Sequence, residues 1–192
     1  MTEEIINKLP EQLGKHICTL KKASMDTTND YSMCDSSIEV VNFDKLPNEY
    51  SRGRGWNSVP NSNDALYIDS EDKWYFIEFK NGSIHKEEIY RKMYDSLIML
   101  IELNIIPNFN FIRENIKYIL VYNGEKYGKQ IQKAPSRDKS YNYFMKLAQQ
   151  EEKLFGIDKF EGYLFNETHT YTQDLFEDKF IKLKEQEEGI VS

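Results

Sequence analysis

The sequence predicts an α/β protein in which helices flank a mixed central sheet. Three segments rich in β-branched and aromatic residues predict strands near residues 64–68, 73–80 and 116–122. Between the second and the third, residues 84–103 carry apolar side chains every three to four positions, which predicts a helix. The resulting order is strand, strand, helix and strand. The last strand is almost continuously apolar, which indicates an inner position in the sheet.

The first two strands form a predicted hairpin, with the polar residues 69–72 as its turn. Because side chains alternate between the two faces of a strand, Glu78 and Lys80 share one face at the end of an otherwise apolar segment. If the strands pair, Asp64 lies at the open end of the neighbouring strand, close to both side chains. Two acids and a lysine are therefore expected to converge on one spot.

Such a set of side chains suits metal-assisted chemistry on a phosphate. Two carboxylates supply the hard oxygen ligands that Mg²⁺ prefers. A bound divalent ion activates water and stabilises charge that develops on a phosphoryl oxygen. A lysine ammonium can orient the nucleophile or neutralise the phosphate. An acid and a lysine two residues apart on a strand are also common as a solvated pair, and that interpretation stays open.

Asp64, followed by Glu78-Phe79-Lys80, resembles the motif of the PD-(D/E)XK nuclease-like superfamily. Asn63 stands before Asp64 where the family often has proline. The resemblance implies a restriction-endonuclease-like αβββαβ core, with Mg²⁺ or Mn²⁺ held by Asp64, Glu78 and the main-chain carbonyl of Phe79. It also implies that Lys80 positions or activates the attacking water. The predicted catalytic residues are thus Asp64, Glu78 and Lys80.

The resemblance further implies contributions from the elements before and after the hairpin. An element before it can lend another acidic residue, for which Glu39 is the first candidate and Glu49 the second. Either one can equally be a surface carboxylate. The helix after the hairpin often places a polar side chain by the site, and Lys86 or Tyr90 could serve, although solvation at the surface is the simpler role for both.

The composition is that of one soluble globular domain. The chain has 192 residues, which is long enough for a sizeable core, and no apolar run approaches the length of a membrane span. The N-terminus lacks the basic and apolar regions of a signal peptide. Cys18 and Cys34 give neither metal-ligand spacing nor a disulfide framework. These features predict a reduced, cytoplasmic protein without a membrane partner.

The net charge of −7 is unevenly distributed. Acidic side chains exceed basic ones in residues 1–50 and 134–192, whereas residues 51–133, which hold the motif, are nearly neutral. An acidic chain argues against a non-specific duplex binder, because such a protein needs a broad basic surface. A nuclease is not excluded, since local patches matter more than the total charge.

Two segments carry most of the predicted contacts to nucleic acid or to a partner. Residues 47–63 have the glycine, proline and serine content of a loop, in which two arginines and a tryptophan can touch a phosphate backbone and stack on a base. A plain loop anchored by its tryptophan is an equal alternative. Residues 126–139 hold the basic cluster of the chain, which suits phosphates or an acidic protein. The predicted contact residues are Arg52, Arg54, Trp56, Lys86, Lys129 and Lys133.

The remaining segments predict elements packed around a nuclease-like core at roughly residues 36–125, within a single domain over 1–192. Residues 3–24 predict a helix with a weak point at Pro10. Residues 36–46 suit a strand or a helix equally. The other expectations are loops at 25–36 and 104–115, a helix at 141–155, a strand pair at 160–171 and a helix at 173–188, the helices making a C-terminal extension over 140–188.

Three functions remain open. The first is a divalent-metal-dependent nuclease that hydrolyses phosphodiester bonds of nucleic acid, and the intact Asp-Glu-Lys set favours it. The second is a catalytically inactive binding protein on the same fold, such as an immunity protein or inhibitor. It would neutralise a basic protein partner, for instance a toxin, through an acidic surface. The third is a structural module in which Glu78-Phe79-Lys80 arises by chance.

Overall fold

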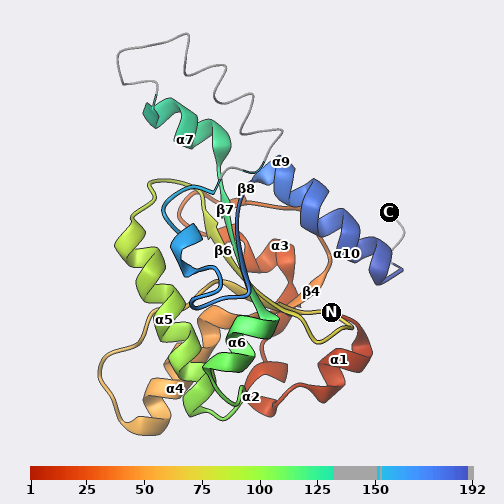
Figure 1. The fold of residues 1–192 in the computed structure, drawn as a ribbon, viewed down its shortest axis with the longest axis vertical. Helices are drawn as coiled ribbons and strands as arrows, with labels where there is room; N and C mark the ends of the chain where they lie inside the picture. The colour runs from red at the N-terminus through yellow and green to blue at the C-terminus, as the bar shows by residue number, and fades with distance from the viewer. Residues whose placement is uncertain (132–150, 152, 190–192) are drawn as a thin grey trace.

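The computed structural model describes residues 1–131, 151 and 153–189. Among these residues, six strands form one mixed sheet with helices on both sides (Figure 1). In spatial order the strands are β1 (Ile17–Thr19), β4 (Glu39–Asn42), β5 (Ala65–Ile68), β6 (Trp74–Lys80), β7 (Ile116–Tyr122) and β8 (Glu167–Thr172). A separate hairpin pairs β2 (Met25–Asp26) with β3 (Tyr31–Ser32).

The order of strands and helix along the chain is the one that the sequence predicts, and the predicted hairpin is formed. Strand β5 lies antiparallel to both β4 and β6, whereas β7 lies parallel to β6 and β8 lies parallel to β7. The chain crosses from β6 to β7 through α5 (Lys86–Glu102), the helix predicted over 84–103. Strand β4 adds a third antiparallel strand before the predicted hairpin. The expectation of a mixed sheet flanked by helices is confirmed.

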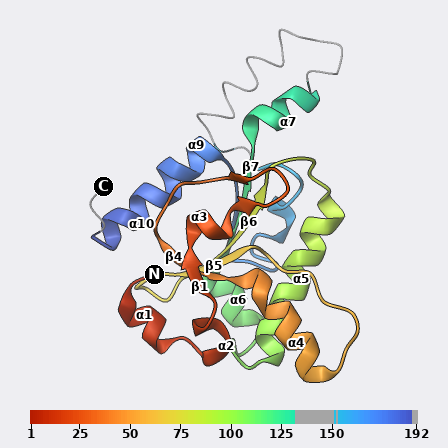
Figure 2. The same cartoon turned by 180° about the vertical axis from the view of Figure 1, so that it is seen from behind.

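Alternation along β6 decides which helices cover which face of the sheet. On one face, Trp74 packs edge-on against Phe111 and Glu78 meets the α5 residue Lys92. On the other face, Tyr75 and Phe79 pack against aromatic residues of the C-terminal helices, which are α9 (Gln173–Phe176), the π-helical turn η3 (Glu177–Ile181) and α10 (Lys182–Glu187). Figures 1 and 2 accordingly show the sheet passing between α5 and the α9–α10 helices.

The N-terminal segment is not the long helix that its periodicity predicts. It forms α1 (Glu3–Lys8), α2 (Glu11–Gly14), β1 and α3 (Leu20–Ala23). Pro10 separates the first two helices, and Thr19 caps α3 by accepting a hydrogen bond from the Lys22 amide. Between α2 and α3, the chain forms β1, which pairs with β4. Pairing to a distant strand has therefore overridden the local helical pattern.

Two further segments predicted as loops contain helices. After the turn η1 (Phe43–Lys45), α4 (Leu46–Arg54) starts with Pro47 in its first turn and ends at Gly55, whose φ of 67° suits glycine. In the second segment, Asn108 caps α6 (Phe109–Asn115) by accepting hydrogen bonds from two backbone amides. Proline and glycine thus mark helix ends in the first segment, and asparagine marks one in the second.

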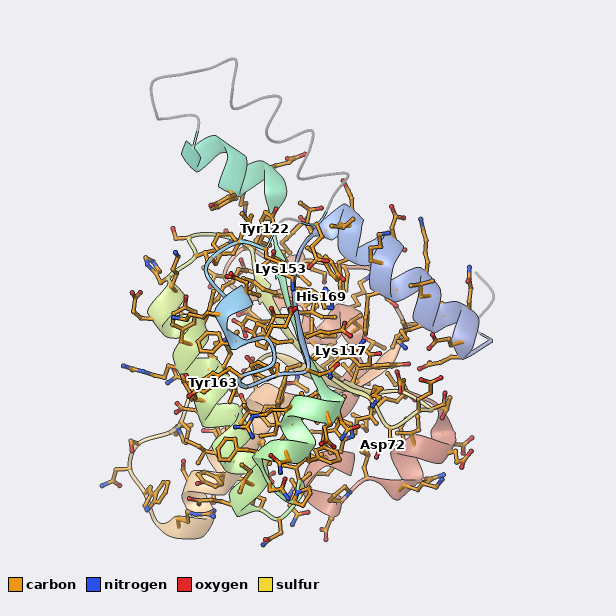
Figure 3. All side chains as sticks on the ribbon, viewed as in Figure 1. Asp72, Lys117, Tyr122, Lys153, Tyr163 and His169 are labelled. Atoms are coloured by element: carbon orange, nitrogen blue, oxygen red, sulfur yellow. The ribbon has the colours of Figure 1, made fainter. Side chains whose placement is uncertain are left out.

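Strand β8 extends the sheet beyond the predicted limit of the core at residue 125. The strand pair predicted over 160–171 is represented by the turn η2 (Asp158–Phe160) and the single strand β8, so the C-terminal part is not purely helical. A further helix, α7 (Gly124–Ile131), follows β7. Lys117 on β7 lies 3.0 Å from Glu167 on β8, and His169 lies 3.0 Å from Glu151 (Figure 3). Most of the helix predicted over 141–155 lies outside the described residues.

One buried carboxylate joins the turn of the β5–β6 hairpin to the C-terminal helix α10. Asp69, in the turn between β5 and β6, accepts hydrogen bonds from the Lys73 amide at 2.9 Å and from the Tyr75 hydroxyl at 2.9 Å. It also accepts one from the Lys184 ammonium of α10 at 3.0 Å. Burial alone would raise the pKa of Asp69, but these hydrogen bonds outweigh it and hold the pKa below its ordinary value.

Among the described residues, no helix combines the length and the apolar character that crossing a bilayer requires.

Replacing Asp69 with Asn should lower the free energy of unfolding at pH 7 by about 1 to 3 kcal/mol, because Lys184 would lose its buried counter-charge and keep only the more exposed Glu187, 2.7 Å away. A group with a lowered pKa stabilises the fold above its unfolded value of about 3.9, and this contribution disappears as the pH falls below that value. Urea unfolding at pH 7 and at acidic pH measures both effects. The exposed neighbour provides the control Glu71→Gln, and an equal small effect of both substitutions would contradict the prediction.

Candidate functional site

Pairing of β5 with β6 brings the two predicted acids together. Ala65 pairs with Ile77, so Asp64 enters the sheet beside Glu78. The Phe79 amide donates a hydrogen bond of 2.6 Å to Asp64 Oδ2, and the Phe43 amide donates one of 3.0 Å to the Asp64 main-chain oxygen. Asp64 is thus fixed by its backbone and by its side chain.

A lysine of α5 bridges the two carboxylates. Lys92 Nζ lies 2.7 Å from Glu78 Oε1 and 3.2 Å from Asp64 Oδ1. Side chains of a helix lean toward its N-terminus, and the N-terminus of α5 follows directly after β6. Lys92 can therefore reach back to the end of the strand that carries Glu78.

Lys80 approaches the same carboxylate from the strand itself. Its ammonium lies 3.3 Å from Glu78 Oε1 and 2.5 Å from Glu88 of α5. Glu78 is fully buried, with 0% of its side chain exposed. Its second oxygen, Oε2, has no hydrogen-bond partner within the described part of the chain. The structure thus brings Asp64, Glu78 and Lys80 together, as the motif predicts, and adds Lys92 between the acids.

Burial and mutual repulsion dominate the electrostatics of the pair. Burial, and next the charge of Asp64, raise the pKa of Glu78 to about 8 although both lysines oppose the shift. Burial also raises the pKa of Asp64 against the effect of Lys92. Burial disfavours the Lys92 ammonium, but Glu78 and Asp64 outweigh it and raise the pKa of that group. A positive charge beside Asp64 and Glu78 therefore favours the ionised form of both carboxyl groups.

Residues of one turn of α5 form hydrogen bonds with the segment that precedes β5. Asp95 accepts hydrogen bonds from the amide and side chain of Asn61, at 2.9 and 3.1 Å. The Ser96 hydroxyl accepts one of 3.0 Å from the Asn63 amide. Together with Lys92, these residues lie three and four positions apart, which puts them on one face of the helix. The helix and the Asp64 segment are docked as one unit.

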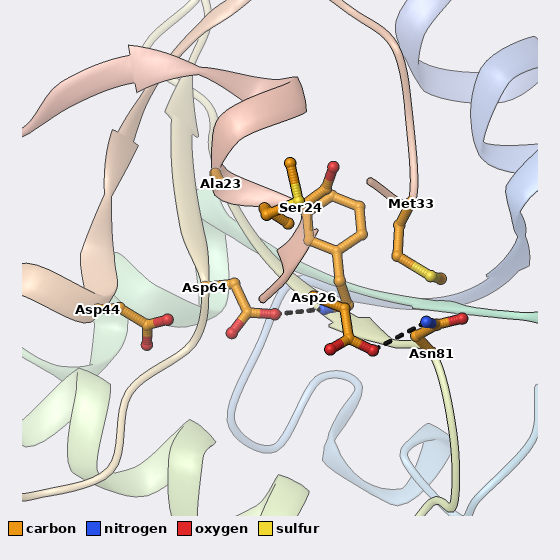
Figure 4. A pocket seen from close by; sticks show the side chains of 9 residues that line it. Ala23, Ser24, Asp26, Met33, Asp44, Asp64 and Asn81 are labelled. Atoms are coloured by element: carbon orange, nitrogen blue, oxygen red, sulfur yellow. Dashed lines mark hydrogen bonds between the residues drawn. The ribbon is translucent and has the colours of Figure 1, made fainter. Parts of the chain in front are cut away.

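A pocket of about 190 Å³ opens beside Asp64 (Figure 4). Asp26 from the β2–β3 hairpin, Asp44 from η1, Asp64 and Phe79 are among its lining residues. Asp44 accepts a hydrogen bond of 2.7 Å from Ser62, and Asp26 accepts one of 2.8 Å from Asn81. The pocket is therefore acidic, and it is bordered by the residue that follows Glu78.

The further acidic residue beside Asp64 is Asp44 and not Glu39. Phe43 pairs with Asp64 through its amide, so its neighbour Asp44 reaches the pocket. Glu39 lies four residues earlier on β4, roughly 13 Å back along the strand, and its side chain is exposed. Glu49, the second candidate, pairs with Lys15 and with His16 at 3.3 Å. The sequence analysis did not point to Asp44, because residues 36–46 suited a strand or a helix equally and the end of β4 was therefore unknown.

The predicted arginine and tryptophan contacts lie elsewhere. Arg54 stacks on the Tyr50 ring at 3.8 Å and pairs with Glu102 at 3.0 Å, while Trp56 packs edge-on against Tyr50. Glu102 ends α5, ten residues and roughly 15 Å from Lys92 along the helix. Arg52 is exposed on the same helix α4. Arg52, Arg54 and Trp56 therefore lie near the C-terminal end of α5, away from the carboxylate site.

The remaining predicted residues divide in the same way. Lys86 is exposed at the start of α5, and the Tyr90 hydroxyl donates to the Phe155 carbonyl at 2.9 Å. The polar side chain that α5 brings to the site is thus Lys92. A signal for it was present, because Lys92 and Ser96 form a polar pair at helical spacing beside the apolar stripe. Lys129 lies in α7 with its side chain undescribed, and Lys133 lies outside the described residues.

No protein-family model matches the chain, and neither does any curated protein or solved structure. In the part of the chain that the structure describes, no group of three or more His, Cys, Asp or Glu side chains is arranged as a metal site. What the geometry offers is a pair of carboxylates that share one cation, the Lys92 ammonium.

Tyr118 on β7 provides a test of the buried polar environment around this pair. Its hydroxyl is fully buried and, among the described residues, has no hydrogen-bond partner. Tyr118→Phe should leave the free energy of unfolding unchanged or raise it, because removing an unpaired buried hydroxyl removes a desolvation cost and no hydrogen bond. Tyr67→Phe should cost about 1 kcal/mol or more, since the Tyr67 hydroxyl donates a 2.6 Å bond to Glu188.

Chemical denaturation of both variants measures the difference. A loss of stability in Tyr118→Phe as large as that in Tyr67→Phe would mean that the Tyr118 hydroxyl binds a buried water or ion, against the prediction.

Proposed function

We propose that this chain is a divalent-metal-dependent nuclease of the PD-(D/E)XK type, hydrolysing phosphodiester bonds. The observation that carries the proposal is the convergence of Asp64 and Glu78 on one cation, 3.2 and 2.7 Å from their oxygens, with Lys80 3.3 Å from the same Glu78 oxygen. Asp64 precedes β5 whereas Glu78 and Lys80 belong to β6, and it is the pairing of these two strands that brings the three side chains together.

The donor set fits a hard divalent ion. Both carboxylates already direct an oxygen at a common positive charge, and Glu78 Oε2 is buried without a partner among the described residues. Asp64, Glu78 and the Phe79 carbonyl would hold Mg²⁺ or Mn²⁺, which favour oxygen ligands. Such an ion supplies activated water and charge stabilisation when bound. Asp44 offers a further carboxylate at the same pocket.

The order of elements supports the same assignment. Helix α3 precedes β4, β5 and β6 in an antiparallel succession, α5 follows, and β7 returns parallel to β6. This succession is compatible with the restriction-endonuclease-like αβββαβ core that the motif implies, with α4 inserted between β4 and β5. The motif then stands at the end of the central strand, where the helix that follows can reach it.

Lys80 acts in this proposal through its charge. Burial disfavours its ammonium, but Glu78 and Glu88 outweigh that effect and raise the pKa of Lys80. A lysine that stays protonated cannot take a proton from water at neutral pH. Its role is to orient the attacking water by donating a hydrogen bond and to offset charge on the phosphate.

One observation favours the second function, a binding protein on the same scaffold. Lys92 already pairs with one oxygen of each carboxylate from within the chain, which is how a nuclease fold could persist without a metal ion. The acidic ends of the sequence would then form the surface for a basic partner such as a toxin. Metal binding separates the two functions more directly than any feature of the fold.

Asp64→Asn or Glu78→Gln should reduce Mg²⁺-dependent cleavage of nucleic acid by at least about a hundredfold, because each removes a charged ligand that acts in the transition state. Lys80→Met should reduce cleavage strongly and leave metal binding intact. The Asp64→Asn, Glu78→Gln double variant should be scarcely worse than either single one, since the residues act as a unit. Labelled single- and double-stranded DNA and RNA serve as substrates.

The exposed carboxylate of α6 supplies a matched control, Glu114→Gln, which should cleave like the wild type. Calorimetry with Mn²⁺ completes the test. Absence of both binding and cleavage in the wild type would reject the nuclease function.

If the chain is instead a binding protein, its affinity for a basic partner should fall as salt is added, because exposed charges are screened within about 10 Å at 0.1 M salt. Capture from host extract at low and high salt, followed by identification of the bound protein, measures this. Salt-insensitive capture of a neutral or acidic protein would contradict the acidic-surface argument.

A further inference from the structure

We propose that the Lys92 ammonium is a built-in competitor of the metal ion, occupying the cation position between Asp64 and Glu78 until a divalent ion displaces it. The inference rests on the proposed function, because it concerns the same two carboxylates. It goes further by naming the residue that sets how tightly the metal binds.

The competition follows from shared oxygens. Lys92 Nζ uses Glu78 Oε1 at 2.7 Å and Asp64 Oδ1 at 3.2 Å. A divalent ion held by the same carboxylates would bring two more positive charges beside the ammonium. Like charges at contact distance repel strongly away from bulk water. The two cations therefore exclude each other, and metal affinity is reduced by the free energy of breaking both Lys92 ion pairs.

Lys80 does not have the same effect. It touches only Glu78 in the acidic pair and is held from outside by Glu88 at 2.5 Å. Lys92 alone of the two lysines contacts both acids. Its helix is also anchored at Asp95 and Ser96 to the segment that enters β5. The ammonium is consequently positioned by the fold itself and occupies the site in the metal-free protein.

Displacement is possible because the Lys92 side chain is long and its surroundings are not closed. About a sixth of its surface, 16%, is exposed. The lysine side chain has a flexible chain of four carbons, so it can move its ammonium into solvent without moving the helix. The metal-free and metal-bound forms then differ in one side chain and not in the fold.

The test compares Mn²⁺ binding by calorimetry among wild type, Lys92→Met and Arg91→Met. The control removes the same charge from the neighbouring exposed position of α5. Lys92→Met should bind Mn²⁺ at least about tenfold more tightly than the other two proteins, a coupling of ordinary size for linked sites. Adding Asp64→Asn to Lys92→Met should remove the gain, which locates it at this pair.

Removing Lys92 takes one positive charge from two buried carboxylates and leaves only Lys80 beside Glu78, which destabilises Lys92→Met in the absence of metal. Lys92→Gln keeps a hydrogen-bond donor without the charge and serves as the second variant. Its melting temperature should rise with Mn²⁺ more steeply than that of the wild type, because a ligand of the native state stabilises it according to its affinity. A Mn²⁺-dependent rise no larger than in the wild type would count against the proposal.

The outcomes distinguish this inference from the function on which it rests. Equal Mn²⁺ affinity in the wild type and both Lys92 variants overturns the competition and leaves a metal-dependent nuclease standing. Binding by the Lys92 variants with none by the wild type supports the competition and overturns the metal-dependent activity of the natural protein. No binding by any of them overturns both.

Discussion

A fully buried carboxylate at the end of the central strand is the constraint on which this structure depends. Glu78 follows four apolar or aromatic residues in β6 and is itself inaccessible to solvent. Ionised carboxylates are costly in such surroundings unless positive groups and hydrogen bonds meet them. The fold meets Glu78 with Lys80 from the strand and Lys92 from α5. Both β6 and the α5 helix that follows it thus supply the positive charge that Glu78 requires.

The parts of the fold that the sequence predicts well are those in which local pattern and final environment agree. Strands β5, β6 and β7 are buried nearly throughout, so their apolar character signals them directly. The predictions of one N-terminal helix and of two loops were wrong for a different reason. In β1, pairing with a distant strand decides the conformation, and in α4 and α6, proline and asparagine begin helices although they are also typical of loops.

The same division holds within the site. Asp64, Glu78 and Lys80 were predictable because hairpin pairing and strand alternation follow from spacing alone. Asp44 and Lys92 depend on where a neighbouring strand ends and on how a helix is rotated about its axis. The position of the strand end and the rotation of the helix cannot be predicted from the residues of one segment alone. The rotation of α5 is set by Asp95 and Ser96, whose partners belong to the chain before β5.

Docking of α5 onto the segment before β5 also has a kinetic consequence. Because Asp95 and Ser96 tie the helix to residues that run straight into Asp64, helix and carboxylate cannot separate without breaking three hydrogen bonds. Sliding of a helix belongs to the microsecond-to-millisecond range, whereas a lysine changes its rotamer far faster. Under the proposed competition, exchange of the positive charge at this site would therefore be a side-chain event, and the residence time of a bound ion would be set by its own contacts and not by a movement of the backbone.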